Sequence, residues 1–173
     1  DYSLSSPYTG DPVATSGHGT AVSGIISAVG WNNMGSIGVA PGAKFAGFQF
    51  LNSLQSTELL VHQSSGNFNV FNYSYGDALY EDNLSDSVYL AHLKHQTITE
   101  SKVFVKAAGN EHRLASGTTC APHNANFPFE NESPFLIIVG AVSSISANPT
   151  LNHTAIKSTY SNTGSNIWVS APG

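Results

Sequence analysis

A histidine set between two glycines is the first feature of this sequence that can carry chemistry. His18 directly precedes apolar residues with the spacing of one helix face: Val22, Ile25, Ile26 and Val29. We therefore expect a helix that begins at His18 and turns this apolar stripe toward a core. An imidazole fixed there can transfer protons near neutral pH, although a capping or surface histidine is the alternative interpretation. A nucleotide-binding loop fits less well, because the segment lacks the third glycine of a dinucleotide fingerprint and the lysine of a phosphate loop.

Two expected strands end in small and polar residues that suit a binding site. One strand runs into Ser74, Tyr75 and Gly76, and another runs into Ala107, Ala108, Gly109 and Asn110. Open α/β sheets place their sites at the carboxyl ends of strands. Backbone N–H and C=O groups there can pair with an extended peptide, and Asn110 adds a side-chain amide donor. Together with His18, these residues suggest a base, a peptide-binding edge and an oxyanion donor.

Strand-like segments alternate with helical patterns along the chain. Strands are expected at residues 43–51, 69–75, 103–108, 135–142 and 167–169, and helices after His18, over 57–63 and over 86–96. Ser85 is the expected cap of the last helix, with Leu84, Val88 and Ala91 on its apolar face. Residues 135–142 are almost continuously apolar, which is typical of a strand covered on both faces. The alternation predicts an α/β fold with a mostly parallel sheet.

Composition excludes several classes of function. The 173 residues suit one domain with a sizeable core, and no break in composition suggests two. The formal net charge is −5 and no Lys/Arg cluster is present, so nucleic acid and anionic membrane are poor partners. No apolar run has the length of a membrane span, and the first residues are not a signal peptide. Cys120, the single cysteine, cannot form an internal disulfide.

Seven segments together resemble one protein family in order and spacing. They are residues 17–20 (Gly-His-Gly-Thr), 38–41 (Gly-Val-Ala-Pro), 72–76 (Asn-Tyr-Ser-Tyr-Gly), 107–110 (Ala-Ala-Gly-Asn), 138–142 (Ile-Val-Gly-Ala-Val), 160–162 (Tyr-Ser-Asn) and 171–173 (Ala-Pro-Gly). This set resembles the subtilisin-like serine peptidases from about residue 16 to the last residue. The resemblance implies a three-layer α/β/α fold with a mostly parallel sheet, and a serine endopeptidase that acts through an acyl-enzyme.

The resemblance also assigns roles to single residues. His18 matches the general base and Asn110 the side-chain oxyanion donor. Ser74, Tyr75 and Gly76 match the strand that pairs with the substrate backbone. Ala107, Ala108 and Gly109 match a wall of the pocket for the residue before the scissile bond. The chain looks closer to the kexin-like branch, which cuts after basic residues, but Leu79, Pro128 and Phe129 stand where acids are expected, so we expect an apolar preference.

Two members of the family's catalytic triad are not found in this chain. No aspartate lies in an apolar strand before His18, and the Gly-Thr-Ser nucleophile motif would follow Gly173. We therefore expect a partial domain, incomplete at both ends, with a loop at 1–17 and a core at 18–173, that is inactive alone. The rival hypothesis is a non-catalytic member that binds peptides through the same groove, and a nucleotide-binding domain is a distant third.

The resemblance implies a structural calcium site and export. Asn32 would supply a side-chain oxygen, and Val29, Met34 and Ser36 would supply carbonyls, all of them hard donors suited to Ca²⁺; a plain surface loop is the alternative. Family habit implies a propeptide and a secreted, periplasmic or cell-surface location. Protein or peptide is the expected substrate. Because flanking elements are expected to be missing, apolar surface should be exposed, through which the chain could self-associate.

Overall fold

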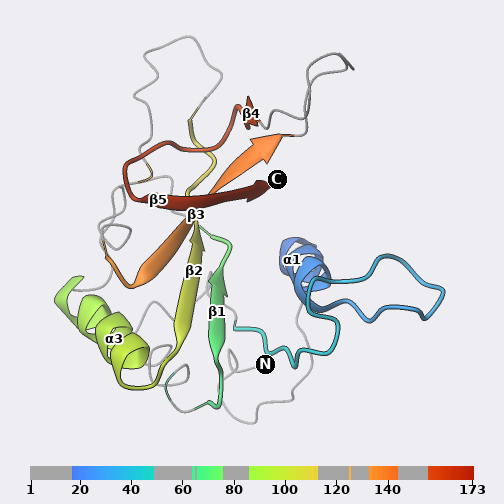
Figure 1. The fold of residues 1–173 in the computed structure, drawn as a ribbon, viewed down its shortest axis with the longest axis horizontal. Coiled ribbons are helices and arrows are strands. Elements are labelled where there is room, and N and C mark those ends of the chain that lie inside the picture. The colour runs from blue at the N-terminus through green and yellow to red at the C-terminus, as the bar shows by residue number, and fades with distance from the viewer. Residues whose placement is uncertain are drawn as a thin grey trace. The chain divides into compact units, whose positions relative to one another are not determined.

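A computed structural model describes residues 17–48, 64, 66–75, 86–112, 125, 133–143 and 156–173 (Figure 1). The chain divides into two compact units, residues 1–65 and 66–173, and each unit is described by itself. Several features predicted above lie outside the described residues: the helix at 57–63, Gly76, Leu79, Leu84, Ser85, Cys120, Pro128 and Phe129.

Helix α1 (His18–Ser27) lies in the first unit and begins at His18 as predicted. The chain turns back after the helix and covers its carboxyl end. Gly38 N donates to Ala28 O at 3.0 Å, and the backbone amides of residues 39 and 40 donate to the carbonyls of residues 25 and 26 at 2.9 and 2.8 Å. These bonds satisfy carbonyls that a helix end otherwise leaves unpaired. Gly38 is required for this approach, because a Cβ there would lie 2.6 Å from Ser27 N.

Two predictions for the first unit are corrected. The apolar stripe of α1 is not buried, since no residue of the helix is buried and Ile25 is 69% exposed. Residues 43–48, the described part of the expected strand 43–51, form no strand. Periodicity identifies which side of a segment is apolar, but burial and strand pairing need a partner. The described part of this unit supplies none.

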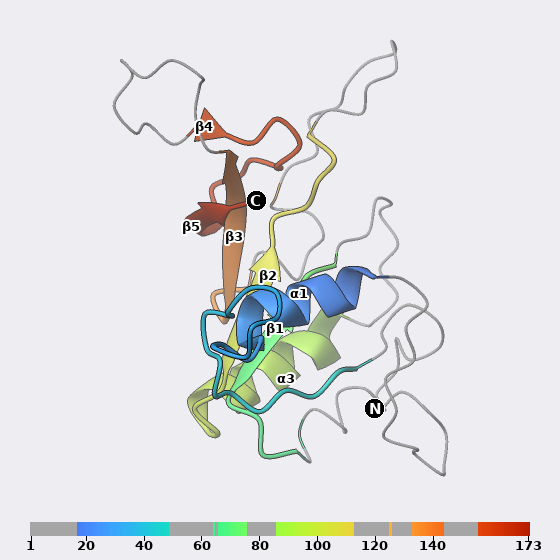
Figure 2. The same ribbon diagram turned by 90° about the vertical axis from the view of Figure 1, so that its right-hand side faces the viewer.

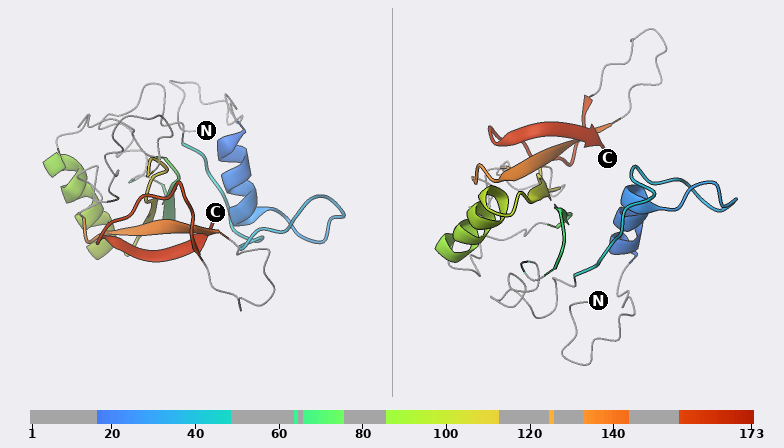
Figure 3. Two further views of the ribbon diagram at one scale, coloured as in Figure 1. Left: turned by 90° about the horizontal axis from the view of Figure 1, so that it is seen from above. Right: turned by 60° about the horizontal axis from the view of Figure 1, so that its bottom comes forward.

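The second unit is built on a mostly parallel sheet, which confirms the predicted α/β class. Its strands are β1 (Val70–Tyr73), β2 (Val103–Ala107), β3 (Leu136–Ser143), β4 (Ile156–Lys157) and β5 (Ile167–Pro172). β1, β2, β3 and β5 pair in parallel, and only β4 is antiparallel among the strands described. Figure 3 shows β3 and β5 running side by side. β4 was not predicted, and β5 extends three residues beyond the predicted end at residue 169.

The position of β4 brings a distant segment to the end of β2. Val142 pairs with Lys157 of β4 and also with Pro172 of β5, so these strands occupy opposite edges of β3. β2 pairs with β3 as far as Val139. β4 therefore continues along the edge of β3 that β2 leaves, near the carboxyl end of β3 (Figure 2). The loop that follows β4 therefore lies beside the residues that follow β2.

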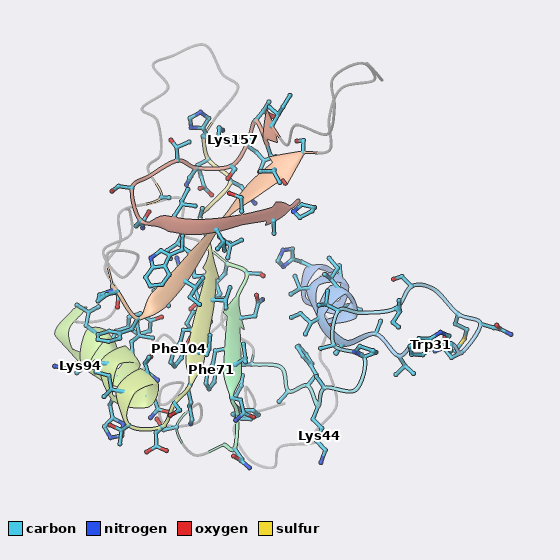
Figure 4. The ribbon with its side chains drawn as sticks, viewed as in Figure 1. Trp31, Lys44, Phe71, Lys94, Phe104 and Lys157 are labelled. Atoms are coloured by element: carbon cyan, nitrogen blue, oxygen red, sulfur yellow. The ribbon has the colours of Figure 1, made fainter. Side chains whose placement is uncertain are left out.

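The core lies on one face of this sheet, beneath helix α3 (Asp86–Ile98). Phe71 and Phe104 stack on neighbouring strands, with ring centroids 4.8 Å apart (Figure 4), and the His92 ring of α3 meets Phe104 edge-on. The predicted helix is confirmed, but its buried stripe is Tyr89, Leu93 and Gln96, whereas Val88 and Ala91 are exposed. Both sets have helical spacing. The sheet packs against the side with the larger side chains.

The opposite face of the sheet is not covered within the described part of the second unit. The exposed side chains on it include Val70, Val103 and Val169, the last of them 52% exposed. Along β3, buried and half-buried residues alternate as far as Ala141, so the described part of this unit covers one of the two faces predicted to be covered. No described helix is long and apolar enough to cross a bilayer.

Candidate active site

The ends of β1 and β2 form the centre of the candidate site. Ser74 and Tyr75 follow β1 directly, and residues 108–110 follow β2. Because Tyr73 pairs with Lys106 in parallel register, both segments leave the sheet at the carboxyl ends of the strands. Within the described residues β1 has β2 as its one paired neighbour. Backbone groups of an edge strand can pair with an added strand.

The residues around Tyr75 fix the first of these segments. The Tyr75 ring centroid lies 5.4 Å from that of Tyr73, and the Lys106 ammonium lies 5.9 Å from the Tyr75 ring centroid. An ammonium at that distance is attracted to the face of the ring. The Ser74 hydroxyl accepts a hydrogen bond from the Asn72 amide at 2.8 Å. Sequence reasoning missed Lys106, although a lysine within an apolar strand was a visible signal.

The second segment turns sharply at Gly109. Ala108 is buried and its N–H donates to Val139 O at 3.0 Å, so the ladder between β2 and β3 continues one residue beyond the strand. Gly109 then adopts φ +98°, a conformation that other residues rarely take. A Cβ at this position would also lie 2.6 Å from the Glu111 carboxylate and closer still to the side chain of Asn162. Only glycine fits this turn without displacing its neighbours.

Asn110 presents its side chain from a fixed backbone. Its N–H donates to Glu111 Oε2 at 2.8 Å, while the residue itself is exposed. No hydrogen bond joins its side-chain amide to any residue in the described part of the chain. Amide donors held in advance can stabilise a developing oxyanion, which is the role predicted for Asn110.

Asn162, which lies in the loop after β4, is a site residue that sequence reasoning missed. Its N–H donates to Gly109 O at 3.0 Å, and the residue is 4% exposed. Its membership of the Tyr-Ser-Asn segment was the one signal in the sequence. Nothing local to that segment indicates contact with the turn at Gly109.

His18 belongs to the first unit and is the first residue of α1. Gly17 precedes it as the N-cap and gives the helix no side-chain cap. The imidazole is exposed and has no hydrogen-bond partner among the described residues. The general base predicted at this position would use one ring nitrogen to accept a proton.

The loop after α1 offers oxygen donors of the kind that bind Ca²⁺. Asn32 Oδ1 accepts a hydrogen bond from Met34 N at 3.0 Å, which folds the side chain back over its own loop. Positive φ angles at residues 31, 33 and 35 curl the backbone. No described backbone amide donates to the carbonyls of Val29, Met34 or Ser36. Among described residues no cluster of three acidic, His or Cys side chains forms, so the available donors are amide and carbonyl oxygens.

Sequence comparison shows which known proteins this chain is similar to. The family profile described as the Subtilase family matches residues 2–173. An extracellular serine protease of Aeromonas sobria is 35% identical over 94% of this chain, and a microbial serine proteinase of Aeromonas salmonicida is 34% identical over 98%. The chain spans 29% of the length of each of these relatives.

Solved structures show the same relationship. The crystal structure of the serine protease of Aeromonas sobria aligns with a TM-score of 0.75 and 33% identity, over 95% of this chain and 30% of that one. The MycP3 protease from the type VII (ESX-3) secretion system aligns with a TM-score of 0.58 and 25% identity, over 90% of this chain and 48% of that one. MycP1, at 19% identity and a TM-score of 0.60 over 92% of this chain and 53% of that one, shares the fold.

Proposed function

Because this chain belongs to the subtilase family, we propose that the full-length protein containing it is a serine endopeptidase that works through an acyl-enzyme. This chain supplies the general base and an oxyanion donor, and the nucleophile comes from outside it. The single observation that carries the proposal is the turn after β2, where the Asn110 amide has no partner among the described residues and the backbone is fixed at Gly109 and Glu111. Membership of the subtilase family is the reason to assign the Asn110 amide to the oxyanion.

The proposed reaction uses each site residue in turn. His18 accepts the proton of the serine hydroxyl as its oxygen attacks the scissile carbonyl carbon. The carbonyl oxygen becomes an oxyanion, and the Asn110 amide donates a hydrogen bond to it. The C–N bond then breaks, and the proton on His18 passes to the leaving amine. Water, activated by the same histidine, hydrolyses the acyl-enzyme and regenerates the serine.

The substrate is proposed to be an extended peptide. Its backbone would pair with Ser74, Tyr75 and Gly76, and a side chain would lie against Ala107, Ala108 and Gly109. The small, apolar wall favours an apolar residue before the scissile bond. Leu79, Pro128 and Phe129, on which the comparison with kexin-like specificity depends, lie outside the described residues, so this preference stays a prediction.

Two further properties belong to the same proposal. Calcium would bind the loop after α1 through Asn32 Oδ1 and the carbonyls of Val29, Met34 and Ser36, where it would hold the loop against the helix end. The protein would act outside the cytoplasm, as the first of the Aeromonas relatives is named an extracellular protease. Both are inferences from the family and from the donor chemistry of the loop.

A serine-reactive fluorophosphonate probe tests the proposal directly. The probe would be applied to this chain and to the full-length protein, followed by assay of peptide hydrolysis. We expect labelling of the full-length protein alone. His18→Ala should abolish turnover, and Asn110→Ala should lower kcat by about 10²–10³-fold, the loss known for the matching donor of subtilisin. His95→Ala, at an exposed position of α3, is the matched histidine control and should change neither.

The outcomes separate the proposal from its rival. Failure of both proteins to label, combined with measurable peptide affinity, would establish a non-catalytic binding module. Labelling of this chain alone, which holds no Gly-Thr-Ser motif, would show that another nucleophile is used. Either result would overturn the proposal.

A further inference from the structure

Asn162 holds the turn that carries Asn110 at three points, once through its backbone and twice through its side chain. Its backbone N–H donates to Gly109 O at 3.0 Å. Its side-chain Oδ1 accepts from Glu111 N at 3.0 Å, and its Nδ2 donates to Glu111 Oε2 at 2.9 Å. Both polar atoms of the side-chain amide are thus engaged by Glu111, and the backbone N–H is engaged by Gly109, on the other side of Asn110.

The Glu111 carboxylate links Asn162 to Asn110. The same oxygen, Oε2, that accepts from Asn162 Nδ2 also accepts from Asn110 N at 2.8 Å. The hydrogen bond from Asn162 therefore fixes the acceptor that fixes the backbone of Asn110. Since the Asn110 side chain has no partner of its own in the described structure, its direction depends on this backbone.

The loop that carries Asn162 is itself fastened to β3. Ser158 N donates to Ala141 O at 2.9 Å, and Ala141 N donates to Ser161 Oγ at 3.0 Å. The Lys157 ammonium, labelled in Figure 4, donates to the carbonyls of Ser158 and Ser161 at 2.9 and 3.0 Å. Asn162 therefore projects from a braced segment, which is what precise support of a neighbouring group requires.

We propose that Asn162 is the positioning residue for the oxyanion donor Asn110, acting through Gly109 O and the Glu111 carboxylate. The inference rests on the proposed function, in which Asn110 stabilises the oxyanion. An interaction realised only in the transition state affects kcat rather than substrate binding. Misplacement of a catalytic group by about 1 Å can cost on the order of 10²-fold in rate.

The test is a double-mutant cycle on kcat in the full-length protein. Asn162→Ala should lower kcat by about 10–100-fold with little change in KM. In an Asn110→Ala background the same substitution should cause almost no further loss, because the donor that it positions is already gone. Asn67→Ala is the matched control: Asn67 is exposed and precedes β1, at the end of that strand opposite to Ser74, so its loss should leave kcat unchanged.

A second variant covers the case in which Asn162→Ala does not fold. Asn162→Asp keeps the shape and the acceptor for Glu111 N but replaces the Nδ2 donor with a second carboxylate oxygen facing Glu111. We expect kcat to fall by about tenfold or more. Adding Glu111→Gln removes the repulsion and restores a donor, so part of the lost kcat should return.

The possible results distinguish this inference from the function on which it rests. If Asn110→Ala leaves kcat unchanged, the oxyanion role fails and the inference fails with it. If Asn110→Ala lowers kcat but Asn162→Ala lowers it by the same factor with and without Asn110, then Asn162 acts on general structure and the inference alone is overturned. An Asn162→Asp protein with wild-type kcat would overturn it as well.

Discussion

Replacing Gly109 with alanine should destabilise the protein through two separable effects. The backbone at Gly109 has φ +98°, and holding a residue with a Cβ in such a conformation costs about 1–3 kcal/mol. The new methyl group would press against Asn162 Nδ2 and lie 2.6 Å from Glu111 Oε2, and overpacking of this kind costs about 1–3 kcal/mol. We therefore expect the free energy of unfolding to fall by about 2–6 kcal/mol. Because the displaced groups hold Asn110, kcat should fall as well.

Urea unfolding of the full-length protein measures the first quantity, in a His18→Ala background so that self-digestion does not accompany unfolding. Asn162→Ala makes room for the methyl group, so in that background Gly109→Ala should cost about 1–3 kcal/mol less. Gly140→Ala is the matched control: its Cβ would lie 3.2 Å from the rotatable Ser170 hydroxyl, and its cost should stay below about 1 kcal/mol. If Gly109→Ala is as well tolerated as this control and retains full kcat, the turn is not constrained as argued.

Three further predictions concern the core, the pH response and the calcium loop. Phe104→Ala removes a ring stacked on Phe71 and should cost about 3–5 kcal/mol in urea unfolding, whereas Val88→Ala, on the exposed side of α3, should change stability by less than about 0.5 kcal/mol. Burial lowers the pKa of His92, so as pH falls through about 6.5 the unfolded chain gains a proton before the folded one and stability decreases. His92→Leu should flatten the dependence of unfolding free energy on pH between about pH 7.5 and 5.5. An unchanged dependence would assign it to other groups. Calcium should raise the melting temperature of the wild-type full-length protein but raise that of Asn32→Ala less, and equal shifts would remove Asn32 from the ligand set.

Local patterns in the sequence determined much of the sheet and the order of the site residues. β-branched and aromatic runs predicted β1, β2 and β3 to within about two residues at each end, and the glycines around His18 predicted where α1 begins. The ordered motifs predicted the family, which the comparisons confirm. These features depend on a residue and its near neighbours, which is why they can be read along the chain.

The tertiary structure decided what depends on residues far apart in the chain. Both possible stripes of α3 have helical spacing, and only packing on Phe104 selects Tyr89 and Leu93 over Val88. The partner of Asn162 lies 51 residues away, at Glu111, and this contact exists because β4 takes the edge of β3 beyond β2. A hydrogen bond has no signature in the sequence when the fold alone brings its donor and acceptor within 3 Å. The backbone that presents Asn110 is set by such bonds, so the sequence predicted the donor and the fold determined its support.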